Sequence, residues 1–338
     1  MKILVTGGAG YIGSILTRLL IGKGYDVTLL DRLYFGTDPI KDITDRIKLI
    51  KDDIRWFNPG ILKGIDAVLD LASLSNDPCG ELDPQKTLEI NHKGRVRVAK
   101  LSKKYGVSRY VLASSCSVYG FQANILTEES ALNPLTTYAK ASANAEKEVL
   151  PLADRGFTVT VLRQATVYGY SYRMRFDLAI NGMVLGLYKN GQLRIMRDGK
   201  QWRPFVHVKD TSNAFAKVLE SDVELVNGQI FNVGNNDQNV QIFDLAQAVA
   251  ESIDVPFRYE WYGDTDTRSY RVSFDKIKEK MNYKTNYNPQ EGAKEVFEGL
   301  KTGSLNADDP RTITVKWYKS LIETYSLVKS LEMHGTML

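Results

Sequence analysis

Cysteines and long apolar runs are both scarce in this sequence. The only two cysteines, Cys79 and Cys116, belong to no CxxC or Cys/His pattern, so neither a disulfide framework nor a metal site is expected. No apolar run is long enough to span a bilayer, and the first residues lead into a glycine-rich turn instead of a signal sequence. These absences predict a cytoplasmic protein that works in a reducing compartment, away from membranes.

Charge of one sign is not concentrated in any segment. The 338 residues contain 44 Lys and Arg and 40 Asp and Glu, which gives a net charge of +4. This mild excess suits acidic small molecules such as nucleotides, but it lacks the clustered basic surface of a nucleic-acid-binding protein. The chain also has no repeat, low-complexity tract or Pro/Ser-rich linker, so we expect two lobes packed tightly around a shared cleft.

The N-terminal half alternates regularly between two patterns. Short β-branched apolar runs, typical of buried strands, occur at Ile3–Val5, Val27–Leu30, Ile47–Ile50, Ala67–Leu71, Tyr110–Ala113 and Thr158–Leu162. Amphipathic helical stretches lie between several of them, at Ile12–Gly22, Asp83–Tyr105 and Tyr138–Asp154. This alternation predicts an α/β fold with a Rossmann-type, doubly wound parallel sheet and a smaller, mixed α/β C-terminal substrate lobe.

The pattern is looser beyond Val167. A helix is predicted over Asp177–Lys189, followed by a strand near Leu193–Met196. A return to the sheet is indicated by Phe205–Val208, the helix Asp210–Glu220 and the strand Ile230–Val233. We therefore assign residues 1–166 and 205–233 to the Rossmann domain, 167–204 and 234–327 to the second lobe, and 328–338 to a frayed tail.

A glycine-rich turn follows the first predicted strand directly. Its spacing is Gly7-x-x-Gly10-x-x-Gly13, and an amphipathic helix begins at Ile12. Gly7 permits the tight turn, Gly10 lets the backbone approach a pyrophosphate, and Gly13 allows close packing of helix on strand. The free N–H groups and dipole at the helix N-terminus favour the phosphates. Because strand, glycines and helix agree, the turn predicts a bound NAD.

Asp31 closes the second predicted strand, at about the spacing expected for a carboxylate on the adenosine ribose. A carboxylate there would repel a 2′-phosphate, so Asp31 favours NAD over NADP. Arg32 beside it is typical of NADP sites and keeps that alternative open.

Several separate motifs resemble the extended short-chain dehydrogenase/reductase family, and within it the nucleotide-sugar epimerases and dehydratases. They are the run from Thr6 to Gly13, the run from Ser114 to Gly120, and Tyr138, and the resemblance extends from residue 1 to about 300. It implies transient oxidation of a sugar carbon, in which a tyrosinate removes the hydroxyl proton while a hydride passes to the nicotinamide. Tyr138 would be that base, and Ser115 the hydroxyl that orients the reacting sugar oxygen.

The resemblance also implies further cofactor contacts. Asp53 and Ile54 would meet the adenine, Leu71–Ser73 would line the middle of the cofactor, and Asn91 would lie beneath the sheet near the active site. Alternatively, Asp53 caps a loop and Asn91 satisfies backbone groups. The NAD-binding residues predicted in this way are Gly7, Gly10, Tyr11, Ile12, Gly13, Asp31, Arg32, Asp53, Ile54, Leu71, Ala72, Ser73, Asn91, Ser114 and Tyr138.

One residue that the family pattern requires is missing. The family has Tyr-x-x-x-Lys, with the lysine one helical turn after the tyrosine and on the same face. Here Ser142 occupies that position, Lys140 would lie nearly opposite, and Glu146 shows that the register is kept. The lysine's charge lowers the tyrosine pKa, so its loss leaves open a protein that binds NAD and a nucleotide sugar with weakened or lost catalysis.

The residues after Ser115 bear on the reaction. Dehydratases of the family carry an acidic pair where this chain has Cys116 and Ser117, and decarboxylases usually carry a glutamate at the position of Ser117. Both reactions are therefore disfavoured, 4,6-dehydration most clearly. The prediction is an NAD-dependent nucleotide-sugar epimerase or C4 oxidoreductase, with Cys116 as a core residue.

The substrate is predicted to be a nucleotide-diphosphate sugar. Arginine suits this ligand because its planar fork meets phosphate oxygens bidentately. The residues predicted to contact the substrate are Ser75, Ser115, Thr166, Arg175, Asn181, Arg203 and Arg268. The stretches Leu74–Pro78 and Tyr172–Asp177 resemble a branch that includes GDP-heptose C4 oxidoreductases; the alternative is that Arg173 and Arg175 are solvated charges.

A homodimer is expected from the same resemblance. Relatives pair two helices of each subunit in a four-helix interface, which here would be Asp83–Tyr105 and Tyr138–Asp154.

Overall fold

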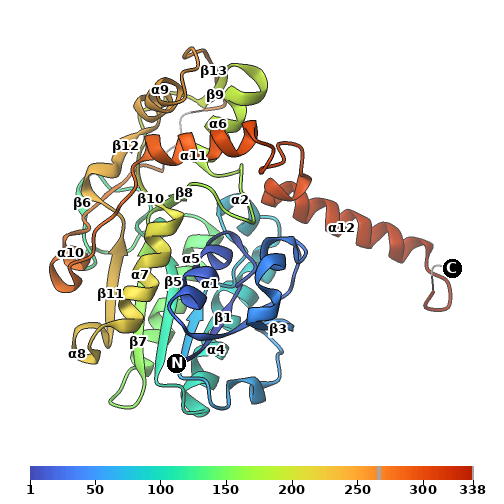
Figure 1. Cartoon of the computed structure of the whole chain (residues 1–338), viewed down its shortest axis with the longest axis vertical. Helices are drawn as coiled ribbons and strands as arrows, with labels where there is room; N and C mark the ends of the chain where they lie inside the picture. The colour runs from blue at the N-terminus through green and yellow to red at the C-terminus, as the bar shows by residue number, and fades with distance from the viewer. Residues whose placement is uncertain (265–267, 337–338) are drawn as a thin grey trace.

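A seven-stranded parallel sheet forms the centre of the computed structural model, which describes residues 1–264 and 268–336 (Figure 1). In spatial order its strands are β11 (Gln229–Val233), β7 (Thr158–Gln164), β5 (Arg109–Ser115), β4 (Ala67–Asp70), β1 (Lys2–Thr6), β2 (Asp26–Asp31) and β3 (Ile47–Lys51). All neighbouring pairs are parallel. The predicted α/β fold with a doubly wound sheet and a smaller, mixed C-terminal region is confirmed.

Successive side chains of each central strand enter two different cores, one on each face of the sheet. In β1, Ile3 and Val5 join one apolar cluster and Leu4 joins the other. Helices α1 (Tyr11–Gly22) and α7 (Val208–Glu220) cover the first face, and α4 (Arg95–Lys104) and α5 (Thr137–Val149) cover the second. Because both faces are covered, the strands are apolar throughout, as parallel sheets require.

Several helices differ from their expected bounds. The stretch predicted as one helix over Asp83–Tyr105 is α3 (Pro84–Leu88), a π-helical turn over Glu89–Gly94, and α4. The stretch from Tyr138 leaves the α-helical conformation at Val149, because Pro151 follows in a 3-10 turn. The Thr136 side chain caps α5 by accepting a hydrogen bond from the Ala139 N–H at 3.2 Å.

The second lobe carries three small sheets. Strand β10 (Trp202–His207) pairs with β8 (Thr166–Tyr168) and β12 (Asn239–Gln241). The two-stranded pairs are β9 (Leu193–Met196) with β13 (Tyr259–Tyr262), and β14 (Arg271–Val272) with β6 (Ile125–Leu126). Helices α6 (Ala179–Asn190), α9 (Ile242–Ser252) and α11 (Pro289–Lys301) pack over a shared apolar core. The remaining short α-helices are α2 (Asp77–Gly80), α8 (Val223–Val226) and α10 (Asp275–Met281).

The segment Phe205–Val208 was expected to mark a return to the sheet domain. Helix α7 and strand β11, which follow it, pack on or join the seven-stranded sheet, whereas β10 itself pairs with β8, the continuation of β7 beyond Ala165. The reason is that β11 already occupies the free edge of β7 along its length. A partly buried cluster then joins the lobes, since Glu295 of α11 accepts hydrogen bonds from His207 at 3.0 Å and from Lys209.

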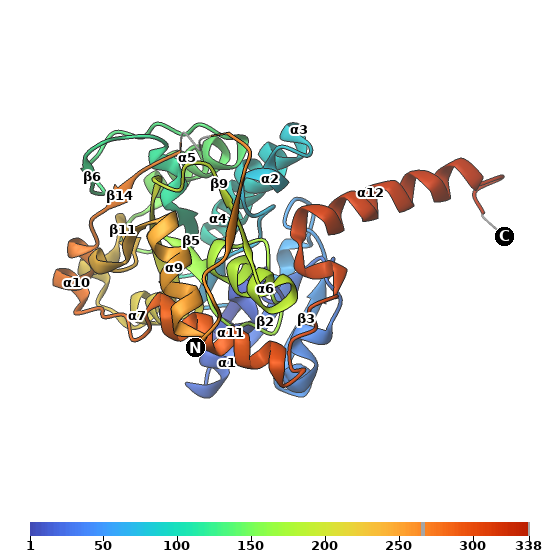
Figure 2. The ribbon, with the colours of Figure 1, turned by 90° about the horizontal axis from the view of Figure 1, so that it is seen from above.

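The last long helix, α12 (Thr314–Leu331), projects away from the rest of the molecule (Figures 1 and 2). It contains no Gly or Pro, so nothing in its sequence stops the helix before Leu331. The helix thus extends past residue 328, where a frayed tail was expected to begin, and residues 337 and 338 lie outside the described part of the chain. None of the helices in the described residues has the length and hydrophobicity needed to cross a membrane.

Candidate active site

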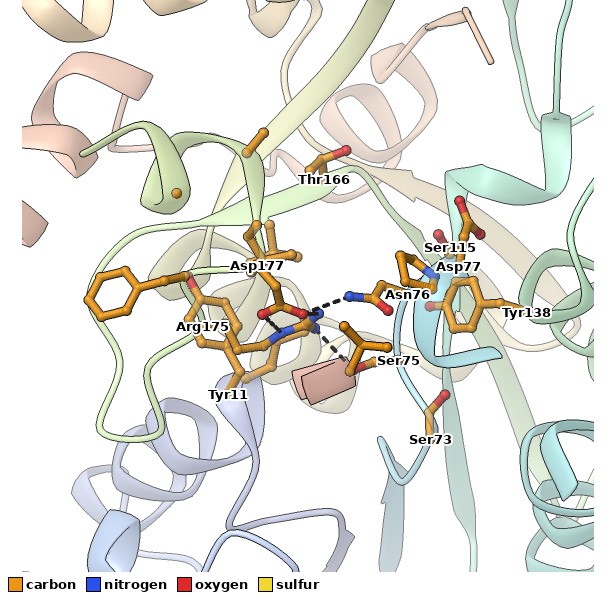
Figure 3. A pocket seen from close by; sticks show the side chains of 18 of the residues that line it. Tyr11, Ser73, Ser75, Asn76, Asp77, Ser115, Tyr138, Thr166, Arg175 and Asp177 are labelled. Carbon is orange, nitrogen blue, oxygen red and sulfur yellow. Dashed lines mark hydrogen bonds and ion pairs between the residues drawn. The ribbon is translucent and has the colours of Figure 1, made fainter. Parts of the chain in front are cut away.

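A cavity of ≈ 910 Å³ opens where the carboxyl ends of β1, β2, β4 and β5 face the second lobe. Ligands of doubly wound sheets bind at this edge. All of the predicted site residues line the cavity except Asn91 and Asn181. Figure 3 shows Ser115, Tyr138 and Asp77 together on one side of the cavity, with Ser75, Arg175 and Asp177 grouped on the other.

The glycine turn is shaped so that side chains would not fit. Gly7 has a φ of +69°, which disfavours other residues. A Cβ on Gly13 would lie 2.2 Å from the carbonyl oxygen of Gly7, and one on Gly10 would lie 3.0 Å from the same atom. The backbone of the turn is thus bare where α1 begins at Tyr11, which fits the approach of a dinucleotide pyrophosphate to the helix N-terminus.

Asp31 ends β2 at the rim of this turn. Its carboxylate accepts hydrogen bonds from the N–H groups of Ala9 at 3.0 Å and Leu33 at 2.8 Å, which leaves lone pairs on both oxygens for a ribose. Burial raises the pKa of this carboxyl, and the two N–H groups offset part of that effect. Arg32 points instead to Asp53, with 2.9 Å between Nη1 and Oδ2. Its charge is thus already paired, which agrees with NAD rather than NADP.

Two predicted site residues, Asn91 and Asn181, lie behind the cavity wall and stabilise its loops. Asn91 exchanges two hydrogen bonds with the backbone of Leu74, at 2.8 and 2.9 Å. Asn181 accepts from the N–H of Gly169 at 3.0 Å and donates to the Tyr11 hydroxyl at 3.1 Å. Both amides are fully buried, so they fix the loops that face the ligands and do not meet the cavity themselves.

Tyr138 and Ser115 lie together on one wall of the cavity. Tyr138 lies in the first turn of α5 and Ser115 is the last residue of β5, and Figure 3 shows their side chains near each other. A hydrogen bond with the Ser115 side chain is among the influences that lower the pKa of Tyr138. Close packing of α2 against α5 is possible because residue 80 is glycine, where a Cβ would lie 3.0 Å from the Tyr138 Cβ. Burial raises the pKa of the Tyr138 hydroxyl above its ordinary value, so the group is protonated at neutral pH.

No lysine approaches Tyr138 along α5. Ser142 is buried and its hydroxyl donates to the Tyr138 carbonyl at 3.0 Å, while Lys140 is exposed. The largest influence that lowers the pKa of Tyr138 is the charge of Arg95, a residue that is 2% exposed. Arg95 donates to the carbonyl oxygens of Asp70 at 2.8 Å and Ala113 at 2.5 Å. Its charge offsets only part of the effect of burial.

The positions after Ser115 contribute no acid. Cys116 is buried and its thiol donates to the carbonyl oxygen of Arg163 at 3.3 Å, while burial raises its pKa, so it is a core residue as predicted from the sequence. The Ser117 hydroxyl also lines the cavity, is buried, and has no hydrogen-bond partner among the described residues. Such an orphaned group is one that a bound ligand would satisfy.

A carboxylate does reach this centre from a distant segment. Asp77, at the start of α2, lines the cavity beside Ser115 and Tyr138 (Figure 3). It accepts a hydrogen bond from Thr136 at 2.7 Å and forms an ion pair with Arg268 at 2.5 Å. The sequence did not single out Asp77 as a site residue. It lies within Leu74–Pro78, a stretch that the sequence did indicate as a substrate determinant.

Two buried arginines give the opposite wall a positive charge. Arg175 pairs with Asp177 at 2.7 Å and donates to the Ser75 hydroxyl at 3.0 Å. Arg173 is 5% exposed and packs over the Phe35 ring at 3.6 Å, and its Nε has no hydrogen-bond partner among the described residues. Burial and the charge of Arg175 lower the pKa of Arg173 to about 10. The alternative that these arginines are solvated charges is therefore wrong.

Three further predicted contacts lie at the far end of the cavity. Arg203 donates to the carbonyl oxygens of Trp202, at 2.9 Å, and Arg268, and its guanidinium carbon is 5.3 Å from the centre of the Tyr270 ring. Thr166, the first residue of β8, lines the cavity between the two lobes (Figure 3). These residues are suited to a polar ligand that extends beyond the reacting centre.

Comparison with known proteins identifies the family. Residues 3–234 match the NAD dependent epimerase/dehydratase family. A UDP-glucose 4-epimerase from Lactobacillus helveticus is 28% identical over 343 residues, with 95% of this chain and 98% of the relative covered. UDP-glucuronic acid decarboxylase 1 from Arabidopsis thaliana is 26% identical over 321 residues, with 91% of this chain and 72% of the relative covered.

A solved structure agrees with these relatives. MoeE5 in complex with UDP-glucuronic acid and NAD has a TM-score of 0.80 and 27% identity, and the alignment covers 90% of this chain and 100% of that one. The family match spans well over half of the chain and includes both the glycine turn and Tyr138. The chain therefore belongs to the NAD-dependent epimerase/dehydratase family of nucleotide-sugar-modifying enzymes, within the extended short-chain dehydrogenase/reductases, and NAD is its cofactor.

Proposed function

We propose that this chain is an NAD-dependent nucleotide-sugar epimerase or C4 oxidoreductase. The observation that carries the proposal is the hydrogen-bonded pair of Tyr138 and Ser115 in a cavity that also contains the bare glycine turn. When bound, NAD supplies the acceptor for the hydride, a proton with two electrons, that leaves the sugar carbon. Everything else in the reaction is assigned to side chains of this chain.

Tyr138 acts as the base and Ser115 as its orienting partner. The Ser115 hydroxyl holds the reacting sugar oxygen within reach of the Tyr138 oxygen, which removes the hydroxyl proton as the carbon is oxidised. In epimerisation the same proton returns after the keto sugar presents its other face. Because burial raises the pKa of Tyr138, the tyrosinate is scarce at neutral pH, and the reaction is expected to be slow there.

Redox at one carbon is favoured over dehydration because neither Cys116 nor Ser117, the two residues after Ser115, is an acid. Asp77 is held by an ion pair with Arg268 and a hydrogen bond from Thr136. It is suited to accept a hydrogen bond from a sugar hydroxyl. The neighbouring Ser117 hydroxyl, which lacks a partner among the described residues, would donate to a second sugar oxygen.

The substrate is proposed to be a nucleotide-diphosphate sugar. Arg173 and Arg175 bring two positive charges to the cavity wall, and among the described residues Asp177 is the carboxylate that forms an ion pair with one of them, Arg175. A diphosphate would supply the missing negative charge and accept from the unpaired Nε of Arg173. The uridine-linked ligands of MoeE5 support this class of substrate, and the segments that resemble the GDP-heptose branch make GDP-heptose a candidate alongside UDP- and dTDP-sugars.

The test is to denature purified protein, identify the released dinucleotide, and assay a panel of UDP-, GDP- and dTDP-sugars, with GDP-heptose included, for keto-sugar or epimer formation. We expect NAD and slow conversion of at least one sugar, and a loss of conversion in Tyr138→Phe. No product and no NADH absorbance across the panel would rule out the proposed activity.

A second candidate function, binding without catalysis, is favoured by Ser142, which occupies the position of the lysine in the family pattern. In that case the chain binds NAD and a nucleotide sugar without turnover. Calorimetric binding of a nucleotide sugar by a protein that stays inactive, even as Ser142→Lys, would support it. Turnover by the unmodified chain would end it.

A further inference from the structure

One part of the cofactor cavity is lined by residues from the far C-terminal end of the chain. Val315 and Tyr318, in the first turns of α12, line the cavity together with Asp31 at the end of β2. Both lie beyond residues 3–234, which match the family model, and beyond the resemblance in sequence, which extends to about residue 300. The family pattern therefore assigns these two residues no role.

The Tyr318 ring lies between two sides of the cavity. On one side it packs against the aromatic residues that follow β2, with 5.8 Å between its centre and that of Tyr34 and 5.6 Å to that of Phe35. On the other side α12 packs against α2, the helix that begins at Asp77 (Figure 1). Burial raises the pKa of the Tyr318 hydroxyl, and the nearby charge of Asp31 raises it further. The ring thus lies close to the carboxylate that is predicted to bind the adenosine ribose.

Residues 311–318, which we call the strap, hold the loop after β2 by its backbone. The Trp317 indole donates to the carbonyl oxygen of Tyr34 at 2.7 Å, and the Arg311 guanidinium donates to that of Phe35 at 3.2 Å. Arg311 also forms an ion pair with Asp38 at 2.8 Å, but the Asp38 side chain is 66% exposed, so water weakens this pair. Contacts of this kind can open locally while the body of the protein stays folded.

Thr314 connects the strap to the wall that carries the buried arginines. Its hydroxyl accepts a hydrogen bond from Arg173 at 3.0 Å and donates one to Asp177 at 3.3 Å. Arg173 in turn lies over the Phe35 ring, with 3.6 Å from its guanidinium carbon to the ring centre. The strap therefore contacts three parts of the cavity wall: the loop after β2, helix α2 and the arginine wall.

We propose that Val315 and Tyr318 are contacts of NAD, and that the strap covers the adenosine half of the bound cofactor. An aromatic ring and an aliphatic side chain suit this role, because they can pack on the flat apolar face of an adenosine. The proposal rests on NAD as the cofactor and not on the reaction that the chain catalyses. A cofactor covered in this way leaves only when the strap moves, so the strap chiefly sets the rate of NAD release.

A strap that only supports the loop after β2 would make the same contacts within the protein. The two roles differ in their response to the cofactor. If Tyr318 packs only on Tyr34 and Phe35, its removal destabilises the protein equally with and without NAD. If it contacts NAD, its removal also reduces the stabilisation that NAD confers, because that stabilisation depends on affinity for the folded protein.

Release of NADH into excess NAD tests the contact without any sugar substrate. The full chain is loaded with NADH, and the change in fluorescence after mixing with NAD gives the dissociation rate. We expect Tyr318→Ala to release NADH about tenfold faster, which is the effect of losing one aromatic contact. Tyr325→Ala is the matched control on the projecting part of α12, where Tyr325 is 63% exposed, and its release rate should be unchanged. A folded Tyr318→Ala with the unmodified rate, or equal acceleration in both variants, overturns the proposal.

Thermal unfolding separates a contact with the cofactor from a contact within the protein. NADH should raise the melting temperature of the unmodified chain and of Tyr318→Phe, which keeps the ring, by similar amounts. The rise should be smaller for Tyr318→Ala. An equal rise in all three proteins would mean that the Tyr318 ring packs only within the protein, and the proposal would then fail.

Trypsin cleavage tests the cover itself. Lys316 lies in the strap and Lys329 lies near the end of α12, and both are exposed. The chain around Lys316 can enter a protease only when the strap opens, so NAD should slow cleavage after Lys316 several-fold. Cleavage after Lys329 serves as the internal control and should proceed at the same rate with and without NAD. Mass spectrometry identifies the fragments, and cleavage after Lys316 that NAD does not slow would contradict the cover.

Discussion

Replacing Ser142 by lysine should shift the pH profile of this protein's activity toward lower pH. The substitution returns an ammonium group to the face of α5 that carries Tyr138, one helical turn on. At present burial raises the pKa of Tyr138, and Arg95 offsets only part of that effect. The reaction needs the deprotonated tyrosine, so activity in the unmodified protein should rise with pH up to the raised pKa.

The size of the shift follows from charge and distance. A lysine ammonium about 5 Å from the phenolate, at an effective dielectric constant of ~20, contributes about 3 kcal/mol. At roughly 1.4 kcal/mol per unit, this lowers the pKa of Tyr138 by about two units. At neutral pH the tyrosinate population would rise about 100-fold, but a weaker base transfers the proton less readily, so we expect kcat/KM to rise about tenfold.

The assay is kcat/KM against pH from 6 to 10 on a substrate found in the panel. Ser142→Ala is the control, because it removes the hydrogen bond to the Tyr138 carbonyl without adding charge, and its profile should match that of the unmodified protein. Thermal unfolding and NAD binding must show that Ser142→Lys is folded, since residue 142 is 1% exposed. A folded, NAD-binding Ser142→Lys with an unshifted profile would refute the electrostatic reasoning.

Four other changes test the site and the junction of the lobes. Gly13→Ala places a Cβ against the Gly7 carbonyl oxygen, so calorimetry should show loss of NAD binding. Denaturant unfolding should show that the free energy of unfolding falls by about 1–3 kcal/mol. Asp31→Asn should weaken NAD binding about tenfold while NADP binding improves. Asp77→Asn should raise KM about tenfold, and it should shift the pH profile acidward because the Asp77 charge raises the pKa of Tyr138. Burial alone would raise the pKa of Glu295, but its histidine and lysine partners lower it to about 2. Because solvent screens this partly exposed pair, Glu295→Gln should reduce the unfolding free energy by about 1–2 kcal/mol at pH 7, and the difference should shrink as pH falls from 5 toward 2.

The cofactor end of the site was predictable because its determinants are local. The glycine turn, the strand before it and the helix after it occupy one short stretch, and Asp31 ends the next strand. Ser115 and Tyr138 were predictable for the same reason, since each belongs to a continuous motif at the end or start of an element. Backbone geometry set by neighbouring residues places these groups without help from distant parts of the chain.

Contacts between distant segments could not be predicted in this way. Nothing in the sequence indicates that Asn91 forms hydrogen bonds with the backbone of Leu74. Nor does it indicate that Asn181 donates to the Tyr11 hydroxyl, 170 residues away. The pairing of Asp77 with Arg268 spans 191 residues and depends on how the second lobe closes over the first. The pairing of β10 with β8 could not be predicted either, because which strand edge is free depends on β11, which comes later in the chain.

The contacts of Arg95 explain why it does not replace the missing lysine. Arg95 donates to the carbonyl oxygens at the ends of β4 and β5, so it supports the strands that carry the cofactor wall and Ser115. Its Nε lies 3.7 Å from the Asp70 carboxylate, which takes up much of its charge. The Arg95 guanidinium is therefore held against the sheet, and its charge, partly neutralised by Asp70, acts on Tyr138 only weakly. A lysine on α5 would have been free to approach the phenolic oxygen directly, which is why the raised pKa of Tyr138 persists beside a buried arginine.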